Sequence, residues 1–320
     1  MTCIYIYDNF VRMNLTGKIL LSAICFQSLI FQSVFAQDET EETEEVSYKG
    51  AEGFHLGFYI GGLWANKNST YIYDGYGYDP YGIKYDYYRS YMYRKIVYEN
   101  DPDSSGYIDL IGPELGVVNH EDWRFSEELM PTNLKYETSY LLGIALNYGF
   151  DKKQSIIFNF NFSKLKMLGN FTLQTRNTSF NQPLEEWTNH QFAVSGIEQR
   201  LFIQLGYSRI LGNHEKANFV IEAGLSVNNA SVREHAAHIN NLDIDLTYFD
   251  DNLHGLSNTF YTHYNGWGYG AFAGMGLNLT FNPKYTLQVL YTPSFERMKN
   301  GPEPVTGMQN AVGLRAYYNF

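Results

Sequence analysis

Eight segments of the chain alternate apolar residues with small or polar ones at a period of two. The clearest, residues 140–150, carries a fully apolar face made of Tyr140, Leu142, Ile144, Leu146, Tyr148 and Phe150. The other seven cover residues 56–64, 156–163, 201–208, 219–227, 267–281, 287–291 and 312–320. A period of two predicts β-strands, because a helix would repeat every 3.6 residues.

The connections between these segments alternate in length. Short polar turns cover residues 151–154, 212–216 and 282–284, while long connections cover 66–133, 170–190, 236–265 and 299–307. Outer-membrane barrels have short periplasmic turns and long extracellular loops. The pattern therefore predicts an all-β fold, a transmembrane antiparallel up-and-down β-barrel of eight strands with long extracellular loops. The alternative is ten strands, if residues 85–98 pair as a further hairpin.

Composition supports a membrane setting. The chain has 28 Tyr, 22 Phe and 28 Gly, and only 18% of its residues are charged, against about 25% in a typical soluble domain. Aromatic residues gather near the ends of the apolar faces, which is typical of the girdles that contact membrane lipid. The net charge of −11 argues against a nucleic-acid partner.

The N-terminal region reads as a signal peptide, residues 1–36. An apolar run over residues 19–35 follows Lys18 and ends at Ala36, after which we expect cleavage. Translation starts at either Met1 or Met13. A membrane anchor is the alternative, but four polar residues interrupt the run: Gln27, Ser28, Gln32 and Ser33. Cleavage would remove both cysteines and leave an acidic periplasmic tether, residues 37–52, before the barrel, residues 53–320.

The last ten residues end in Phe320, with Tyr318 two positions before it. This ending resembles the C-terminal signal by which the insertion machinery recognises bacterial outer-membrane barrels. Residues 53–320 as a whole resemble small outer-membrane barrels of the Bacteroidota type, near the OmpX-, OmpA- and PorT-like barrels. The resemblance implies an outer-membrane location and contact of the last strand with the insertion machinery, and it carries no catalytic residues.

The first long connection, residues 66–133, is rich in tyrosine. Tyrosine offers a large contact area at low entropic cost, so one interpretation is a surface that binds a glycan or a protein. The alternative is that these side chains pack over the mouth of the barrel. The candidate ligand-binding residues are Tyr73, Tyr76, Tyr78, Tyr85, Tyr87 and Tyr88.

The same connection contains a partial calcium-loop pattern. Its candidate ligands are Asp101, Asp103, Ser105, the Tyr107 carbonyl and Asp109, with Gly106 at the sharp turn. The twelfth position is Gly112 where a bidentate glutamate belongs, and no flanking helices are evident. A plain acidic turn is the alternative, and no other cofactor is expected.

Four charged residues fall on the inward faces of the predicted strands: Arg200, Glu222, Glu296 and Arg315. The interior of an eight-stranded barrel is just wide enough for side chains, so these charges could pair with one another there.

The function predicted from these features is that of a non-enzymatic surface barrel. Its loops would serve binding, adhesion or envelope structure. One alternative is an accessory barrel of a secretion or assembly machine, and another is a lipid-modifying enzyme. The sequence shows no catalytic set, because Ser195 and Ser294 have no base nearby in the chain.

Overall fold

Eight long antiparallel strands close into a ring in which each pairs with its neighbours in chain order, as predicted. The strands are β1 (Gly53–Trp64), β4 (Ser139–Gly149), β5 (Gln154–Arg176), β6 (Trp187–Leu211), β7 (Ala217–Ile239), β11 (Asn265–Asn282), β12 (Tyr285–Met298) and β13 (Val305–Asn319). This computed structural model describes residues 52–79, 81–97, 107–176, 187–214, 216–247, 249–250, 259–260, 264–282 and 284–320.

Shorter elements fill the long connections. Between β1 and β4 lie η1 (Lys67–Tyr73), η2 (Tyr87–Arg89), α3 (Tyr91–Ile96), α4 (Ile108–Glu114), η3 (His120–Asp122), β2 (Trp123–Arg124), η4 (Glu127–Leu129) and β3 (Thr132–Tyr136). Between β7 and β11 lie β8 (Leu242–Asp245), β9 (Phe249–Asp250) and β10 (Thr259–Phe260). The alternative hairpin over residues 85–98 is wrong, because the described part of that segment contains η2 and the helix α3.

The outward face of the ring is apolar, as a lipid-facing surface requires. Its exposed aliphatic and aromatic side chains include Phe58, Ile60, Leu142, Ile144, Phe158, Phe160, Leu205, Leu225, Val289 and Leu314. Rings cluster where the strands end at the short turns: Phe54 and Tyr318 both lie beside Phe320, with centroids 6.1 and 5.0 Å away. Trp64 and Tyr140 lie at the other end of the same outward face.

Strand β5 changes character after Phe162. Up to that residue its outward side chains are apolar, whereas Lys164 and Lys166 are the next two on the same face. Its inward side chains change in the opposite sense, from Asn159 and Asn161 to buried Leu165, Met167, Phe171 and Leu173. The polar outward face therefore marks where β5 leaves the lipid.

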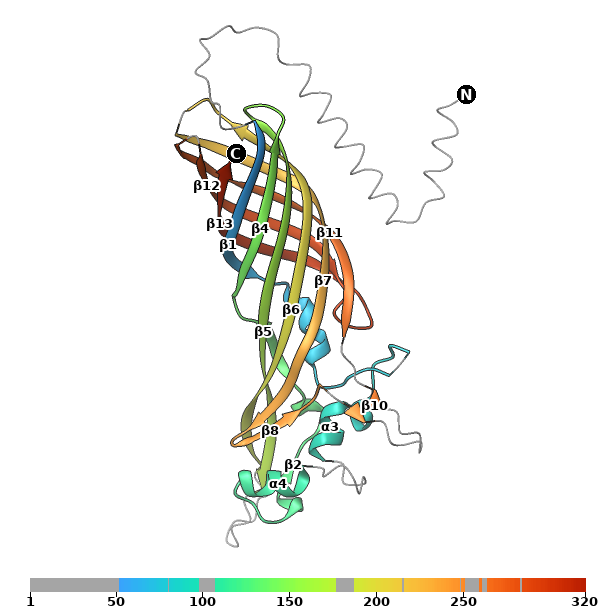
Figure 1. Ribbon diagram of the computed structural model, residues 1–320. Helices are drawn as coiled ribbons and strands as arrows, with labels where there is room; N and C mark the ends of the chain where they lie inside the picture. Colours follow the sequence, from blue (N-terminus) through green and yellow to red (C-terminus); the bar gives the residue numbers. More distant parts are fainter. Residues whose placement is uncertain are drawn as a thin grey trace, which may run out of the picture. The chain divides into compact units, whose positions relative to one another are not determined.

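Beyond this point β5, β6 and β7 continue as an extension of the sheet (Figure 1). β5 is 23 residues long, while a transmembrane strand needs about 9–11. β5 stays paired with β6 up to the pair Arg176–Trp187. Beyond the barrel the other edge of β5 pairs with β3 and β2 instead of β4. The expectation that residues 170–190 form a loop is therefore wrong for residues 170–176 and 187–190, and residues 177–186 lie outside the described chain.

The described part of the first long connection folds against the inward face of this extension. We call its residues 66–79, 81–97 and 107–131 the cap. Its core joins cap residues to β5, β6, β7 and β8, and the fully buried members are Met92, Ile96, Ile111, Leu173, Val194, Ala237, Ile239 and Ile244. The segment predicted as an exposed loop is thus a packed layer, which is the mouth-covering alternative considered for its tyrosines.

The change in character along β5 predicts that the same substitution has a large effect in the lipid-facing part and almost none beyond it. Phe160→Arg should lower the free energy of unfolding by about 2–4 kcal/mol, because the charge enters the lipid band. Thr172→Arg, on the same face but above the lipid, should change it by less than about 0.5 kcal/mol. Urea titration of the barrel in lipid vesicles measures both. Equal losses in the two variants would contradict this placement of the membrane boundary.

Candidate functional site

One buried ion pair occupies the half of the lumen nearer the short turns. Arg315 on β13 donates from Nη1 to Glu222 on β7 at 2.7 Å and to the Gln288 side chain at 3.1 Å. The rings of Tyr59 and Tyr317 lie 5.9 Å from the guanidinium carbon, close enough for cation–π attraction. Register explains the contact with Gln288, which lies directly opposite Arg315 on the neighbouring strand β12.

A second network fills the lumen at the mouth. The Arg200 guanidinium, fully buried, donates from Nε to Glu198 at 2.5 Å, from Nη1 to Gln309 at 2.7 Å and from Nη2 to Ser69 Oγ at 2.8 Å. Gln309 donates in turn to Glu296 at 2.9 Å. The sequence had placed Arg200 and Glu296 inward but missed Glu198, although it shares the inward face of β6 two positions before Arg200.

Glu296 is held mainly by neutral groups. Besides Gln309, it accepts hydrogen bonds from Ser226 at 3.1 Å and from Asn228 at 3.0 Å. These donors all project inward from β7 and β13 toward a carboxylate that is only 1% exposed. These three hydrogen bonds satisfy the buried carboxylate, whereas the side-chain oxygen of Asn228 has no hydrogen-bond partner among the described residues.

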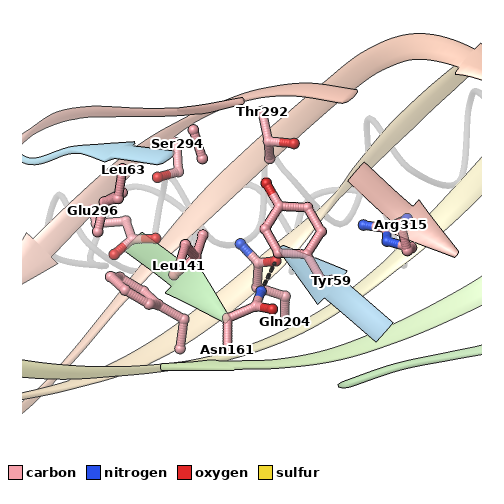
Figure 2. Close-up of a pocket in the computed structure, with 11 residues that line it drawn as sticks. Tyr59, Leu63, Leu141, Asn161, Gln204, Thr292, Ser294, Glu296 and Arg315 are labelled. Atoms are coloured by element: carbon pink, nitrogen blue, oxygen red, sulfur yellow. Dashed lines mark hydrogen bonds between the residues drawn. The ribbon is translucent and has the colours of Figure 1, made fainter. Parts of the chain in front are cut away.

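A small cavity lies between the two networks. Its volume is about 30 Å³, which is large enough to admit water. Tyr59, Asn161 and Gln204 surround it, and Asn161 donates a hydrogen bond to Gln204 at 3.4 Å (Figure 2). The cavity is therefore a small space between packed side chains.

The short helix η1 contacts the charged network at the mouth. Its residue Ser69 is fully buried, and the Ser69 carbonyl accepts hydrogen bonds from Asn300 at 2.7 Å and from the Tyr136 hydroxyl at 3.2 Å. The Asn66 side chain accepts from the amide of Asn68 at 3.0 Å and so caps the start of the helix. Ser69 of η1 therefore attaches the cap to the charged network at the mouth.

Three of the six candidate tyrosines are buried. Tyr73 is 0% exposed, and its ring contacts His235 edge-on at 5.2 Å. Tyr78 and Tyr87 are each 7% exposed, and the Tyr87 hydroxyl donates to the Phe125 carbonyl at 2.6 Å. In this conformation these three side chains form the interior of the cap and do not face solvent.

The other three lie nearer the surface. Tyr76 contacts Lys84, whose amine lies 4.0 Å from the ring centroid, and Tyr85 packs against Arg89 at 5.1 Å. Tyr88 is 71% exposed. A ligand approaching from solvent would meet Tyr88 and also Tyr81, which is 89% exposed and was not among the six. Ligand binding by these residues stays a prediction.

The candidate calcium ligands fall largely outside the described residues, since Asp101, Asp103 and Ser105 are not described. Tyr107 precedes α4, and Asp109, in its first turn, lies 2.9 Å from His120 Nε2. The expectation that no helices flank this segment is wrong, because α3 and α4 lie on either side. Within the described ranges, no group of three or more His, Cys, Asp or Glu residues is placed to hold a metal ion.

Comparison with known proteins gives only distant similarities. No protein-family model matches the chain, and no curated protein matches it in sequence. Among solved structures it is similar to neisserial surface protein A, with 9% identity over 85% of this chain and 99% of that one, at a TM-score of 0.39.

Two further solved structures are similar at the same level. Ail, the attachment invasion locus protein of Yersinia pestis, solved with the heparin analogue sucrose octasulfate, is 11% identical over 84% of this chain and 99% of its own, at a TM-score of 0.33. The outer membrane protein OprG of Pseudomonas aeruginosa is 10% identical over 84% and 98%, also at 0.33. A search of the described helices finds none with the length and apolarity to cross a membrane.

The lumen ion pair predicts non-additive losses of stability. Arg315→Met should lower the free energy of unfolding by about 3–5 kcal/mol, because Glu222 is left buried without its partner. Replacing both residues, as Arg315→Met with Glu222→Leu, should cost less than either single change. Urea titration of all four proteins completes the cycle. Additive losses would contradict a direct pairing.

His235 predicts that the cap weakens in acid. This residue lies above the lipid, beyond the exposed side chains of Arg233 and Glu234, and its burial lowers its pKa from 6.5 to about 4. Between these values the unfolded state binds more protons, so stability should fall as the pH drops below about 6.5, by about 2 kcal/mol at pH 5.

The cap can be followed through Trp123, which belongs to its core. In a variant with Trp64, Trp187 and Trp267 replaced by phenylalanine, urea titrations at pH 7.5 and pH 5 should show the loss. Adding His235→Gln should remove that part of the pH dependence. An unchanged dependence in this variant would assign it to other groups.

Proposed function

We propose that this chain is an outer-membrane barrel whose barrel and cap present a binding surface at the cell exterior and do not conduct solutes. The observation that carries the proposal is the filled lumen. The Arg315 network fills the lumen near the short turns and the Arg200 network fills it near the mouth, with a cavity of about 30 Å³ between them. The helix η1 lies at the mouth. A diffusion pore of the porin kind would need a continuous aqueous path.

The exposed side of the cap supports recognition as its role. Three large apolar side chains there are strongly exposed, namely Tyr81 at 89%, Tyr88 at 71% and Val118 at 93%. They are carried by a packed core, so a ligand would lose little of its binding energy to ordering the cap. Exposed tyrosines such as Tyr81 and Tyr88 suit a glycan or a protein as the partner.

The proposal also includes export of the chain and its insertion into the outer membrane. A signal peptide over residues 1–36 would direct export and be removed after Ala36, and β13 would contact the insertion machinery. The Bacteroidota type rests on the resemblance of residues 53–320 and of the ending at Phe320. The outward apolar band would then lie in outer-membrane lipid.

Single-cysteine labelling tests the orientation and the closed lumen together. A chain cleaved after Ala36 has no cysteine, so each introduced thiol reports alone. On intact cells, a membrane-impermeant maleimide should label Tyr88→Cys in the cap and leave Lys153→Cys, in a short turn, unlabelled. Permeabilising the outer membrane should expose Lys153→Cys.

The control is Ser226→Cys, whose site faces the lumen and is 2% exposed. It should stay unlabelled until the barrel is denatured. Early labelling of Ser226→Cys would contradict the closed lumen, and labelling of Lys153→Cys on intact cells would invert the orientation. Protection of Tyr88→Cys on cells, with ready labelling in the purified protein, would show a partner over the cap and favour the accessory role in secretion or assembly.

A further inference from the structure

Three polar residues form a chain of hydrogen bonds on the outward face of the extension. Ser195 Oγ on β6 lies 2.7 Å from His238 Nε2 on β7, and His238 Nδ1 lies 2.6 Å from Asp243 Oδ1 on β8. The three come from separate strands, and 43 residues separate the serine from the histidine. From sequence alone, Ser195 had no visible base.

The strand register produces this contact. His238 lies directly opposite Asp243 across β7–β8 and opposite Ala193 across β6–β7, which places Ser195 on the adjacent diagonal. An irregularity in the β6–β7 register between Ile197 and Glu198 adds one residue to β7 near Arg233. Such a bulge reverses which side chains face outward.

Without the bulge His238 would face inward. Before the bulge the even-numbered residues of β7, such as Ser226 and Asn228, are buried in the lumen. After it the odd-numbered residues His235, Ala237 and Ile239 are buried, and His238 turns outward beside Ser195.

The order of the atoms matches that of a hydrolytic triad. Asp243 on Nδ1 favours the tautomer in which Nδ1 carries the proton, so Nε2 is free to accept the proton of the Ser195 hydroxyl. The imidazole side chain is 38% exposed and that of Asp243 is 78% exposed, so reagents can reach the site. A second hydroxyl–imidazole pair, Thr175 with His190 at 2.8 Å, provides an internal comparison on the opposite face.

We infer that Ser195, His238 and Asp243 form an esterase site, in which Ser195 is the nucleophile, His238 the general base and Asp243 a positioning residue. This goes beyond the proposed function, because it adds an activity on a face that neither the lumen nor the cap uses. The substrate class is a carboxylic ester with a short acyl group. Leu168, Ala193 and Ile197 surround Ser195 in the register and offer a small apolar contact for the acyl chain.

The reaction needs only water as co-reactant. Ser195 Oγ attacks the ester carbonyl carbon while its proton passes to His238 Nε2. The tetrahedral intermediate collapses with cleavage of the bond to the alcohol oxygen, which leaves with the proton from Nε2. Water then attacks the acyl-serine, again giving its proton to His238, and release of the acid returns the proton to Ser195.

Stabilisation of the oxyanion limits the rate. The backbone of β6 at Ser195 pairs with β5 and β7 on its two sides, so its amides belong to the sheet. Asn170 is an exposed amide opposite Ala193 on the same face, and it is the nearest side-chain donor in the register. Loss of one oxyanion donor costs about 10²–10³-fold in other hydrolases, so we expect slow turnover and use covalent labelling as the main readout.

The test is reaction of the full-length folded barrel with a fluorophosphonate probe, with the modified peptide identified by mass spectrometry. Labelling should fall on Ser195 and not on Thr175, and Ser195→Ala should abolish it. His238→Gln should slow labelling at least about 100-fold, by analogy with loss of a general base. Hydrolysis of p-nitrophenyl acetate should follow the same order.

The positioning role of Asp243 is tested by a measurement that a merely structural role would not change. Asp243→Asn should slow labelling at least about tenfold by favouring the wrong tautomer, while Asp243→Glu should restore part of the rate. Thr172→Ala, on the neighbouring strand, is the matched control and should label like the parent. The mobility of unheated samples in electrophoresis verifies that each barrel is folded.

Two outcomes would overturn the inference. One is absence of label on Ser195 in a folded barrel, and the other is an equal labelling rate in the parent and His238→Gln. In either case the three residues are a polar cross-strand ladder on a solvated face. Both outcomes leave the cysteine-labelling test of the cap and lumen unaffected.

Discussion

Closure of the sheet between β1 and β13 is the constraint on which the rest of this structure depends. In lipid every backbone amide and carbonyl must find a partner within the protein, and only a closed ring leaves no strand edge exposed. The ten consecutive pairs from His55–Asn319 to Trp64–Asn310 provide that closure. An eight-stranded ring has a narrow lumen, so a charged side chain inside it needs close partners. Arg315 pairs with Glu222 and Arg200 with Glu198, while Glu296 accepts hydrogen bonds from neutral side chains.

The lipid also determines which parts of the fold could be predicted. In the part of the barrel that faces lipid, each strand has apolar side chains on its outward face and polar or small ones on its inward face. This alternation located all eight strands and the three tight turns. In the extension beyond the lipid the alternation is reversed, because the outward face meets water and the inward face packs against the cap. The predicted third strand ended at Ser163 where the outward face became polar. The continuation was nevertheless visible in Leu165, Met167, Phe171 and Leu173, which occupy the alternate positions.

The cap and the candidate sites depend on contacts that a linear pattern does not show. The helices of the cap are only three to seven residues long, too short for a helical period to stand out, and Tyr73 and Tyr87 serve as packing residues within it. The inward direction of Arg200, Glu222, Glu296 and Arg315 followed from strand parity. Their partners did not, because the fold joins residues that are far apart in the chain, such as Ser69 and Arg200, which are 131 positions apart.

The inward and outward faces of the extension have different roles. Its inward face is committed to the cap core, whereas its outward face is free of the lipid that excludes polar groups from the same strands lower down. A single extra residue near Arg233 then decides which side chains of β7 serve each face. It places His235 beneath Tyr73 in the cap and His238 beside Ser195 in solvent. One bulge thus sets two histidines, three residues apart, in environments of opposite polarity, and this is why only the second of them is placed for proton transfer.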